Sequence, residues 1–404
     1  MQRYFCAQKA YFDAPFDSER NLMKEIYGTY TSAKIFTDSI EPYALAQVQM
    51  LCDQAVSAGS KIRIMPDVHP GKYGPIGLTM TFQDRIFPAL VGIDIGCGMT
   101  CARLGGKKTE YPKLDAVIQK HIPSGVSIRQ TPHSRGMHFP YEKLLCAEHI
   151  HLEKTALSMG TLGGGNHFIE IDRDEEGCHY LTIHSGSRRL GKDVAEHYLR
   201  LGQKELIAKS LTVPYPQTWL EGSLLADYLH DVAIVQDYAE QNRLAILETL
   251  CKYMKWKPGE VFSCPHNYIS RQDDHYLLRK GAISANSSEQ MLIPINMQEG
   301  ILLAEGKGNP DWNCSAPHGS GRLLKRTDVA KQYTVSQFKT AMKGIFCTCI
   351  SKTTLAEAPF AYRDLSYIVS RIADTAKIMK VLTPVYNYKD NNEPHQRTQG
   401  GSNG

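Results

Sequence analysis

Apolar and polar residues alternate along this chain in short segments, and each segment has the period of a strand or of a helix. The ranges with strand-like patterns are 61–69, 85–95, 167–172 and 178–187. Apolar residues at helical spacing mark 41–56 and 223–256 instead. Because both kinds of segment are mixed along the chain, the pattern is typical of an α+β protein. Glycine-rich polar loops adjoin several strands, where a rigid scaffold can aim loop residues at one place.

Two of the predicted strands carry a specific expectation. The strand in 61–69 is expected to break at Pro66, because proline has no N–H to donate to a neighbouring strand. The run 85–95 is apolar and rich in β-branched residues, so it is expected to be a strand that leads into the following loop.

The segment 223–256 is the clearest helix, with Ser223 as its predicted N-cap. The residues that form its apolar face are Leu225, Leu229, Val232, Ala239 and Ile246. The simplest interpretation is a helix packed into the core. Its polar residues Asp231, Gln236, Asn242 and Arg243 are weaker candidates for lining a polar site.

Composition narrows the class of protein. The 404 residues are 42% hydrophobic and 22% charged, an ordinary globular composition. A net charge of +4 is too mild to demonstrate nucleic-acid binding. Most of the 11 cysteines lie in apolar stretches, as expected for reduced thiols of a cytoplasmic protein. No apolar run reaches the roughly 18 residues of a membrane span, so no membrane partner is expected.

The chain is expected to form one domain with a short tail. Residues 391–404 include no apolar side chain and are expected to be disordered. No linker divides the remainder, and the candidate motifs extend from 94 to 318. Because a composite site must converge in space, residues 1–390 are expected to be one catalytic domain.

Five glycine-rich segments carry the candidate chemistry: 91–99, 160–170, 182–192, 264–270 and 316–322. Four are centred on a histidine and one on an Asp-Cys pair. The candidate metal ligands are Asp94, Cys97, His167, His184 and His266. Imidazole, thiolate and carboxylate together suit a borderline divalent ion such as manganese or zinc. Taken singly, Cys97 also fits a buried thiol beside a turn, and His266 fits a structural histidine.

His318 differs from the other histidines, because small residues flank it and Arg322 follows. This setting suits an imidazole nucleophile for phosphoryl or nucleotidyl transfer, with Arg322 on the phosphate. A fifth metal ligand is equally consistent with the residues. The segment after His184, which ends at Arg188, offers hydroxyls, amides and a guanidinium that also suit phosphate.

Three further segments have competing interpretations. Lys280 is a candidate phosphate contact, although a solvated surface lysine is the simpler alternative. The segment 306–310 lacks the ending of a P-loop. The cysteines at 347 and 349 lie in an apolar run without a companion pair, so buried strand cysteines are favoured over zinc.

Eight motifs in order resemble those of one family, the RtcB-type RNA ligases. The motifs are MPDVHPGK (65–72), VGIDIGCGM (91–99), GGGNHF (163–168), HSGSR (184–188), PHN (265–267), RKGA (279–282), GKGNPD (306–311) and HGSGR (318–322). The resemblance implies mixed β-sheets flanked by helices, with the active site built from strand-end loops. It also implies joining of an RNA 3′-phosphate or 2′,3′-cyclic phosphate to a 5′-hydroxyl, using GTP and two Mn²⁺ ions. RNA with these ends is the implied partner, and an accessory repair factor is a further candidate.

The resemblance assigns roles by position. His318 matches the histidine that carries GMP, and Asp67 matches the acid that orients it. The five candidate ligands match those of two manganese ions, with Cys97 shared. The positions implied for the nucleotide are Asn166, Arg188 and Arg322 at phosphates, Phe168, Glu170 and Tyr362 at guanine, and Lys389 at the guanylate. Further nucleotide-binding candidates are Lys280, Ser320 and Gly321 in the matching motifs and Asn296 in the loop 293–301.

Three departures from the family pattern suggest a divergent branch devoted to a particular cleaved RNA. In the loop expected to close over guanine, Asn296 and Ile301 stand where serines are expected. Lys389 is followed by further residues, and Ser320 stands where alanine is usual. Two alternatives remain open here. One is a binuclear metal-dependent phosphodiesterase or phosphatase, and the other is a non-catalytic RNA-binding protein derived from a ligase.

Overall fold

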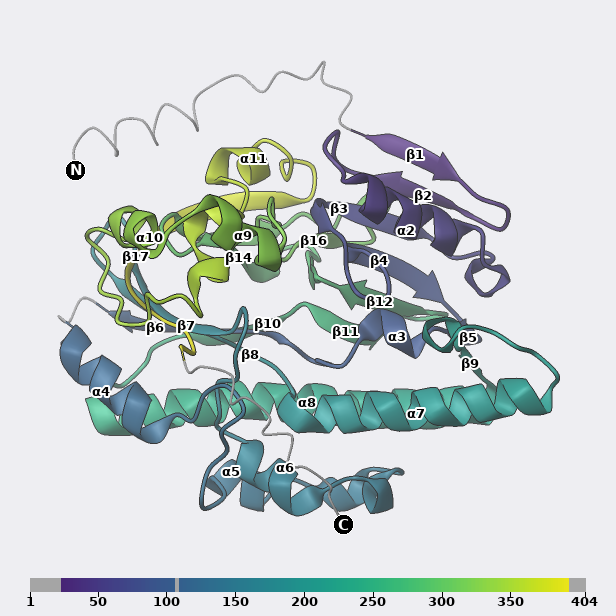
Figure 1. The fold of residues 1–404 in the computed structure, drawn as a ribbon, viewed down its shortest axis with the longest axis horizontal. Helices are drawn as coiled ribbons and strands as arrows, with labels where there is room; N and C mark the ends of the chain where they lie inside the picture. Colours follow the sequence, from purple (N-terminus) through teal and green to yellow (C-terminus); the bar gives the residue numbers. More distant parts are fainter. Residues whose placement is uncertain (1–22, 106–108, 392–404) are drawn as a thin grey trace, which may run out of the picture.

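The computed structural model describes residues 23–105 and 109–391, and two large β-sheets organise them (Figure 1). The first sheet has six strands, in the order β1-β2-β3-β4-β12-β11. Their bounds are β1 Lys24–Tyr27, β2 Ser32–Ile35, β3 Ile62–His69, β4 Ile76–Phe82, β12 Tyr276–Lys280 and β11 Asn267–Arg271. All neighbours are antiparallel except β2 and β3, which are parallel.

The second sheet has seven antiparallel strands, in the order β10-β6-β8-β7-β17-β15-β14. Their bounds are β10 Val261–Pro265, β6 Gly98–Gly105, β8 His179–Ser185, β7 Phe168–Arg173, β17 Ala376–Tyr388, β15 Gly300–Gly306 and β14 Gln290–Asn296. Two small ladders join β13 Ala282–Ser284 with β16 Ser315–Pro317, and β5 Arg85–Ile86 with β9 Leu220–Glu221. The sheets confirm the mixed architecture with flanking helices.

Helices cover both sides of this framework (Figure 1). Two long helices, α7 Arg188–Ala208 and α8 Gly222–Met254, lie along one side. Short helices lie further out beneath them, α5 Ser134–Met137 and α6 Leu152–Ser158. The remaining helices are α2 Pro42–Cys52, α3 Pro88–Val91, α4 Tyr111–His121, α9 Arg326–Gln332, α10 Val335–Ala341 and α11 Leu365–Val369.

Helix α8 links the two sheets, because it packs against β6 and β8 of one and β11 of the other. The predicted apolar face is confirmed: Leu225, Val232 and Ile246 are buried. The predicted N-cap is wrong, since the helix begins at Gly222 and Ser223 lies within its first turn. Gly222 has a φ of +59°, a conformation that glycine adopts without strain.

Three local predictions need correction. Strand β3 continues through Pro66, and only its pairing with β4 is interrupted, between Ile64 and His69. The run 85–95 is not a strand throughout: it contains the short β5 and then α3, which begins at Pro88. The cysteines at 347 and 349 lie in a loop after α10 rather than in a strand.

Beyond residue 391, the tail predicted to be disordered lies outside the described residues. Within the described ranges, no helix has the length and apolarity needed to cross a membrane.

Candidate metal and nucleotide site

The candidate metal ligands converge because their segments meet at one end of neighbouring strands. Asp94 and Cys97 lie in the loop between α3 and β6. His167 immediately precedes β7, and His184 is the next-to-last residue of β8. His266 lies between β10 and β11. Since β6, β8 and β7 are adjacent in the sheet, these side chains meet although up to 172 positions separate them (94 to 266).

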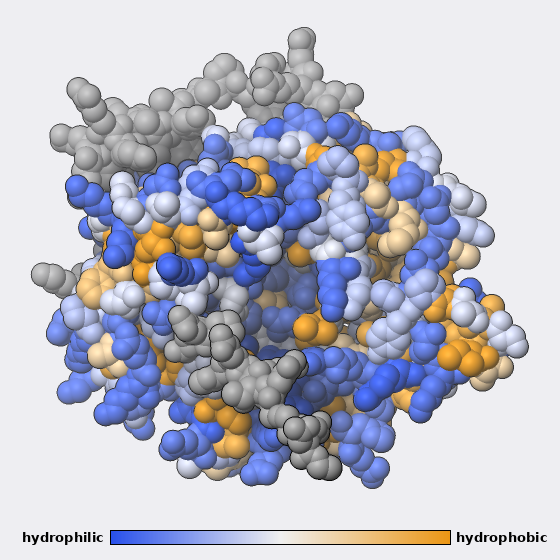
Figure 2. Space-filling view, in the orientation of Figure 1, coloured by the Kyte–Doolittle hydropathy of each residue, from blue (hydrophilic) through white to orange (hydrophobic). Residues whose placement is uncertain are grey.

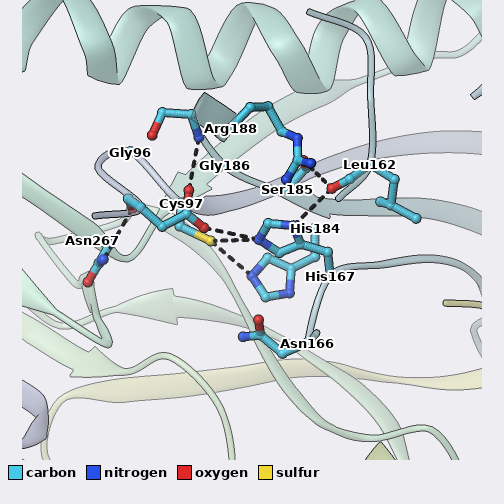
Figure 3. Close-up of polar contacts among 12 residues, drawn as sticks. Gly96, Cys97, Leu162, Asn166, His167, His184, Ser185, Gly186, Arg188 and Asn267 are labelled. Atoms are coloured by element: carbon cyan, nitrogen blue, oxygen red, sulfur yellow. Dashed lines mark hydrogen bonds and ion pairs between the residues drawn. The ribbon is translucent and has the colours of Figure 1, made fainter. Parts of the chain in front are cut away.

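The converging atoms are lone-pair donors (Figure 3). Cys97 Sγ lies 3.5 Å from His167 Nε2 and 3.4 Å from His184 Nε2. His184 Nε2 lies 3.3 Å from His266 Nε2, and Asp94 Oδ2 lies 3.1 Å from His167 Nε2. The thiol and two of these imidazoles form a buried group able to hold a metal ion.

Backbone contacts orient these ligands from behind. His167 Nδ1 lies 2.8 Å from the Leu162 carbonyl, so Nδ1–H donates to it and Nε2 is the ring atom that faces Asp94 and Cys97. The Ser187 amide donates to Asp94 Oδ1 at 3.0 Å. Gly186, the residue before Ser187, must be glycine, because a Cβ atom there would lie 2.0 Å from Asp94 Oδ1.

The electrostatics of the group match a cation. Burial and neighbouring positive groups hold the pKa of His184 and of His266 well below the ordinary value, so both imidazoles are neutral. Burial and the Asp94 carboxylate raise the pKa of Cys97 well above its usual range. Desolvation opposes the charge on Asp94, but the hydrogen bond and charge of His167 outweigh it and lower that pKa. Neutral imidazoles, a thiol and a carboxylate that face one another therefore fit a divalent ion as their common partner.

His318 lies beside this group and is held by an acid from the other sheet. Its Nδ1 lies 2.6 Å from Oδ2 of Asp67, a fully buried residue of β3. Its ring centroid is 4.9 Å from that of His266. Gly321, with a φ of +78°, lets the loop close here, because a Cβ atom would lie 2.4 Å from the Asp67 carbonyl oxygen. The six-stranded and seven-stranded sheets thus each contribute to one site.

A cavity of about 670 Å³ opens next to His318. Figure 2 shows a hollow near the middle of the face drawn in Figure 1. The predicted residues that line the cavity are Asn166, Phe168, Glu170, His184, Asn296, His318, Ser320, Gly321, Arg322, Tyr362 and Lys389. The structure thus brings the predicted nucleophile and most of the predicted nucleotide positions to one cavity.

One wall of the cavity comes from β7 and the end of β17. Lys389 Nζ donates to the Asn166 carbonyl at 3.1 Å and lies 5.1 Å from the centre of the Phe168 ring. Asn387 Nδ2 donates to Glu170 Oε2. Burial raises the pKa of Glu170 to about 7, and burial beside Glu170 raises the pKa of Asp172 well above its usual range. The buried carboxyl groups of Glu170 and Asp172, both on β7, therefore hold a proton more strongly than exposed carboxyl groups do.

Another part of the cavity lining holds a charged network that the sequence did not reveal. Arg322 Nη1 donates to the Tyr362 hydroxyl at 2.8 Å and lies 3.5 Å from Glu357 Oε1. The guanidinium also lies over the Tyr362 ring, 4.8 Å from its centre. Glu357 is almost fully buried, and Arg326 pairs with it as well. Glu357 lies in the quoted segment EAPFAYRD (357–364), but only its contacts with Arg322 reveal its role.

Other predicted residues lie outside the cavity or are engaged within the protein. Lys280 is buried with Nζ 3.5 Å from the Ala89 carbonyl, and burial lowers its pKa to about 8. Arg188 donates to the Thr161 hydroxyl at 3.1 Å and to the Gly125 carbonyl at 2.8 Å. The alternative of a solvated surface lysine is therefore wrong for Lys280, whereas the phosphate contact stays a prediction.

The altered loop positions also have internal roles. Asn296 Oδ1 accepts the amides of Gln298 and Glu299, each at 3.0 Å, and so forms a turn. Ser320 Oγ donates to the Ile295 carbonyl at 2.7 Å. Ile301 is fully buried in the core.

Polar residues of α8 support the site without lining the cavity. Asn242 accepts the amides of Gly160 and Thr161 and donates to the Gly186 carbonyl at 3.0 Å. Arg243 donates to the carbonyls of Gly96 and Ser185, at 2.9 and 3.1 Å. In the sequence, the only sign of this supporting role was that two adjacent polar residues, Asn242 and Arg243, lie in a helix expected to pack into the core.

Two more polar residues of α8 hold backbone elsewhere. Gln236 Oε1 accepts the Ile269 amide at 2.7 Å. Asp231 instead accepts the amides of Leu145 and Cys146. None of the four polar residues of α8 lines the cavity beside His318.

Comparison with known proteins places this geometry in a family. The family model described as tRNA-splicing ligase RtcB matches residues 50–142 and 138–390. The chain is 30% identical to the RNA-splicing ligase RtcB of Escherichia coli (strain K12), covering 80% of this chain and 88% of that protein. It is 27% identical to the tRNA-splicing ligase RtcB of Aeropyrum pernix, covering 78% and 83%. A similar match, 26% identical, covers 80% of this chain and 86% of the tRNA-splicing ligase RtcB of Thermococcus kodakarensis.

Proposed function

This chain belongs to the RtcB family, and we propose that it is an RNA ligase that joins 3′-phosphate or 2′,3′-cyclic phosphate ends to 5′-hydroxyl ends. We further propose that it uses GTP and manganese through a GMP–His318 intermediate. The observation that carries the proposal is the position of His318. It lies between a cluster of metal-type donors and a cavity with room for a nucleotide.

The contact with Asp67 prepares His318 for nucleophilic attack. Because Nδ1–H donates to the buried carboxylate, Nε2 carries the lone pair. Attack on the α-phosphorus of GTP forms a P–N bond and breaks the α–β phosphoanhydride, and pyrophosphate leaves. Asp67 stabilises the positive charge that develops on the ring.

The RNA steps follow from the reactivity of the phosphoramidate. Water first opens a cyclic end: it adds to the phosphorus, the P–O2′ bond breaks, and a 3′-phosphate and a 2′-hydroxyl result. An oxygen of the 3′-phosphate then attacks the phosphorus bound to His318. GMP moves to the RNA end, and the imidazole regains its lone pair. The 5′-hydroxyl of the second RNA end then attacks the activated 3′-phosphate, a phosphodiester forms, and GMP leaves.

The proposed manganese ligands are Asp94, Cys97, His167, His184 and His266. Bound there, the cations would offset negative charge on the attacking and leaving oxygens. For the base, Glu170 is the proposed acceptor for guanine N–H groups, and Phe168 is the proposed contact for the ring face. Lys389 and Arg322 both bring positive charge to the lining of the same cavity.

The test is covalent labelling with GTP or ATP that carries a radioactive α-phosphate, in the presence of manganese. We expect an acid-labile GMP adduct on the wild type and none on His318→Ala. The matched control is His138→Ala, an exposed histidine outside the site, which should be labelled like the wild type. Labelling by ATP instead of GTP would show that the cavity selects adenine rather than guanine. An adduct on His318→Ala would refute His318 as the nucleophile.

A metal-dependent phosphodiesterase is the second candidate, because the converging donors do not themselves require His318. It predicts hydrolysis of a 2′,3′-cyclic phosphate end that survives in His318→Ala. Under that candidate, neither nucleotide forms an adduct in protein shown to contain manganese.

A further inference from the structure

Two cysteines outside the metal group form a close pair in the loop after α10. The sulfur atoms of Cys347 and Cys349 lie 3.3 Å apart, and neither is in a disulfide. Cys349 is fully buried and Cys347 is half-buried. The intervening Thr348 turns its hydroxyl to Asp115, at 2.9 Å, which leaves both sulfurs on the same side of the chain.

The pair contacts the wall of the cavity through its buried member. Cys349 Sγ accepts the backbone N–H of Lys389 at 3.3 Å. The ammonium of Lys389 lines the cavity and reaches the Asn166 carbonyl. A change in the charge or bonding of Cys349 Sγ therefore acts directly on Lys389, whose side chain is proposed to bind the nucleotide.

The surroundings make the two sulfurs unequal. The hydrogen bond from Cys347 and the nearby Lys389 lower the pKa of Cys349, although burial opposes this. The same hydrogen bond, together with burial, raises the pKa of Cys347. One proton between two sulfurs is the arrangement that favours thiol–disulfide exchange, since a thiolate is the attacking form.

A metal is a poor match for this pair. A structural zinc site needs about four ligands. Across residues 23–105 and 109–391, the group of converging metal-type donors is Cys97, His167 and His184, and neither cysteine of the pair belongs to it. Two sulfurs without further ligands fit a covalent bond between them.

We propose that Cys347 and Cys349 are a reversible oxidation site, at which a small disulfide such as oxidised glutathione closes an intramolecular disulfide. Cys347, the sulfur nearer to solvent, attacks one glutathione sulfur while its proton passes to Cys349, and the first glutathione thiolate leaves. Cys349 then loses a proton to water, attacks the Cys347 sulfur of the mixed disulfide and releases the second glutathione. The two cysteines lose two electrons, and oxidised glutathione becomes two molecules of the thiol. Only a small approach is needed to reach the bonding distance of about 2.05 Å.

Closure changes the partner of Lys389. A disulfide sulfur bears no negative charge, so the N–H of Lys389 loses a charge-assisted acceptor. We expect nucleotide labelling of the oxidised protein to fall by about fivefold to tenfold. This consequence rests on the proposed function, whereas the disulfide itself does not.

Peptide mapping tests the disulfide directly. Trypsin cleavage after Lys343 and Lys352 releases GIFCTCISK (344–352), which contains both cysteines and no others. The full chain, loaded with manganese, is equilibrated in glutathione buffers of increasing oxidised fraction and then alkylated. We expect this peptide to lose two hydrogens and to resist alkylation, and dithiothreitol should reverse both changes. A peptide that takes two alkyl groups in the most oxidised buffer, or carries only glutathione adducts, overturns the proposal.

Matched variants then test the link to Lys389. Cys347→Ser and Cys349→Ser should each make GTP labelling insensitive to the glutathione buffer, and the half-buried Cys314→Ser should remain sensitive. If Cys349→Ser misfolds because its position is buried, Cys347→Ser at the half-buried position still tests the link. If the wild-type disulfide closes and labelling is unchanged, the link to Lys389 is wrong. If reduced protein takes no label at all, the proposed function fails while the peptide still decides the oxidation site.

Discussion

His318 Nδ1 lies 2.6 Å from Asp67 Oδ2, and Asp67 has no exposure to solvent. This pair joins the loop after β16 to the C-terminal half of β3, so the imidazole has a defined tautomer and orientation. Asp67→Asn keeps the shape but cannot accept the Nδ1 proton in the same way. We expect the rate of GMP attachment to fall by about 10²- to 10⁴-fold, measured as labelled adduct against time.

The control for this variant is Asp84→Asn, which makes the same change at an exposed position. It should be labelled at the wild-type rate. Thermal unfolding of both variants would show whether the fold is retained. An Asp67→Asn protein that forms the adduct at the wild-type rate would remove Asp67 from the proposed mechanism.

Cys97 contacts two of the histidines through its sulfur, and this makes it the most informative ligand to change. We expect Cys97→Ser to retain less manganese after gel filtration, measured by elemental analysis. Added manganese should also raise its melting temperature less than that of the wild type, because a bound ligand stabilises only the folded state.

Cys101→Ser is the matched control, since Cys101 is also a buried cysteine of the same chain segment. It packs in the core cluster with Met99 and Tyr180, is not one of the converging donors, and should retain the wild-type manganese content. Equal metal content in Cys97→Ser and the wild type would exclude Cys97 as a ligand.

The chain pattern predicted β7, β8 and α8 well, because each has an unambiguous period over its length. It failed at 85–95, where a short apolar run is compatible with either a strand or a buried helix. Pro88, which suits the first turn of a helix, ends the strand there.

For the site, the motifs identified residues that meet in space, but not the contacts that hold them. His167, His184 and His266 were expected together and do converge. The supporting roles of Asn242 and Glu357 depend on which loops pack behind the site, and local patterns do not contain that information. The departures at 296 and 301 likewise had no meaning until Asn296 was found in a turn and Ile301 in the core.

Glu170 makes stability depend on pH in an unusual direction for an acid. Burial raises its pKa to about 7, above the ordinary value of about 4.3. The folded state therefore holds this proton more tightly than the unfolded state does. Its contribution is complete below the ordinary pKa and is lost as the pH rises through 7. We expect this group to lower the free energy of unfolding as the pH rises from about 5 to about 8.

Urea unfolding at several pH values, with chelator present, measures this contribution. Glu170→Gln should show a smaller fall over the same range, because glutamine does not titrate and only Asp172 of the buried pair remains. Glu175→Gln, an exposed neighbour, should follow the wild type. Parallel curves for the wild type and Glu170→Gln would show that Glu170 does not titrate in this range.

Asn242 is the residue of α8 whose loss should affect the fold and the metal together. Its Oδ1 accepts the Gly160 amide at 2.8 Å and the Thr161 amide at 3.1 Å. Asn242→Leu preserves the side-chain volume and leaves these buried amides without an acceptor. We expect a loss of about 2–4 kcal/mol in the free energy of unfolding, measured with urea in the presence of chelator. We also expect weaker manganese binding, since Asn242 supports the Gly186 loop that holds Asp94.

The control variant Gln241→Leu changes the adjacent, half-buried residue. It should lower the free energy of unfolding by less than about 1 kcal/mol and should retain metal binding. If the two variants are equally stable and bind manganese equally well, α8 does not support the site through Asn242.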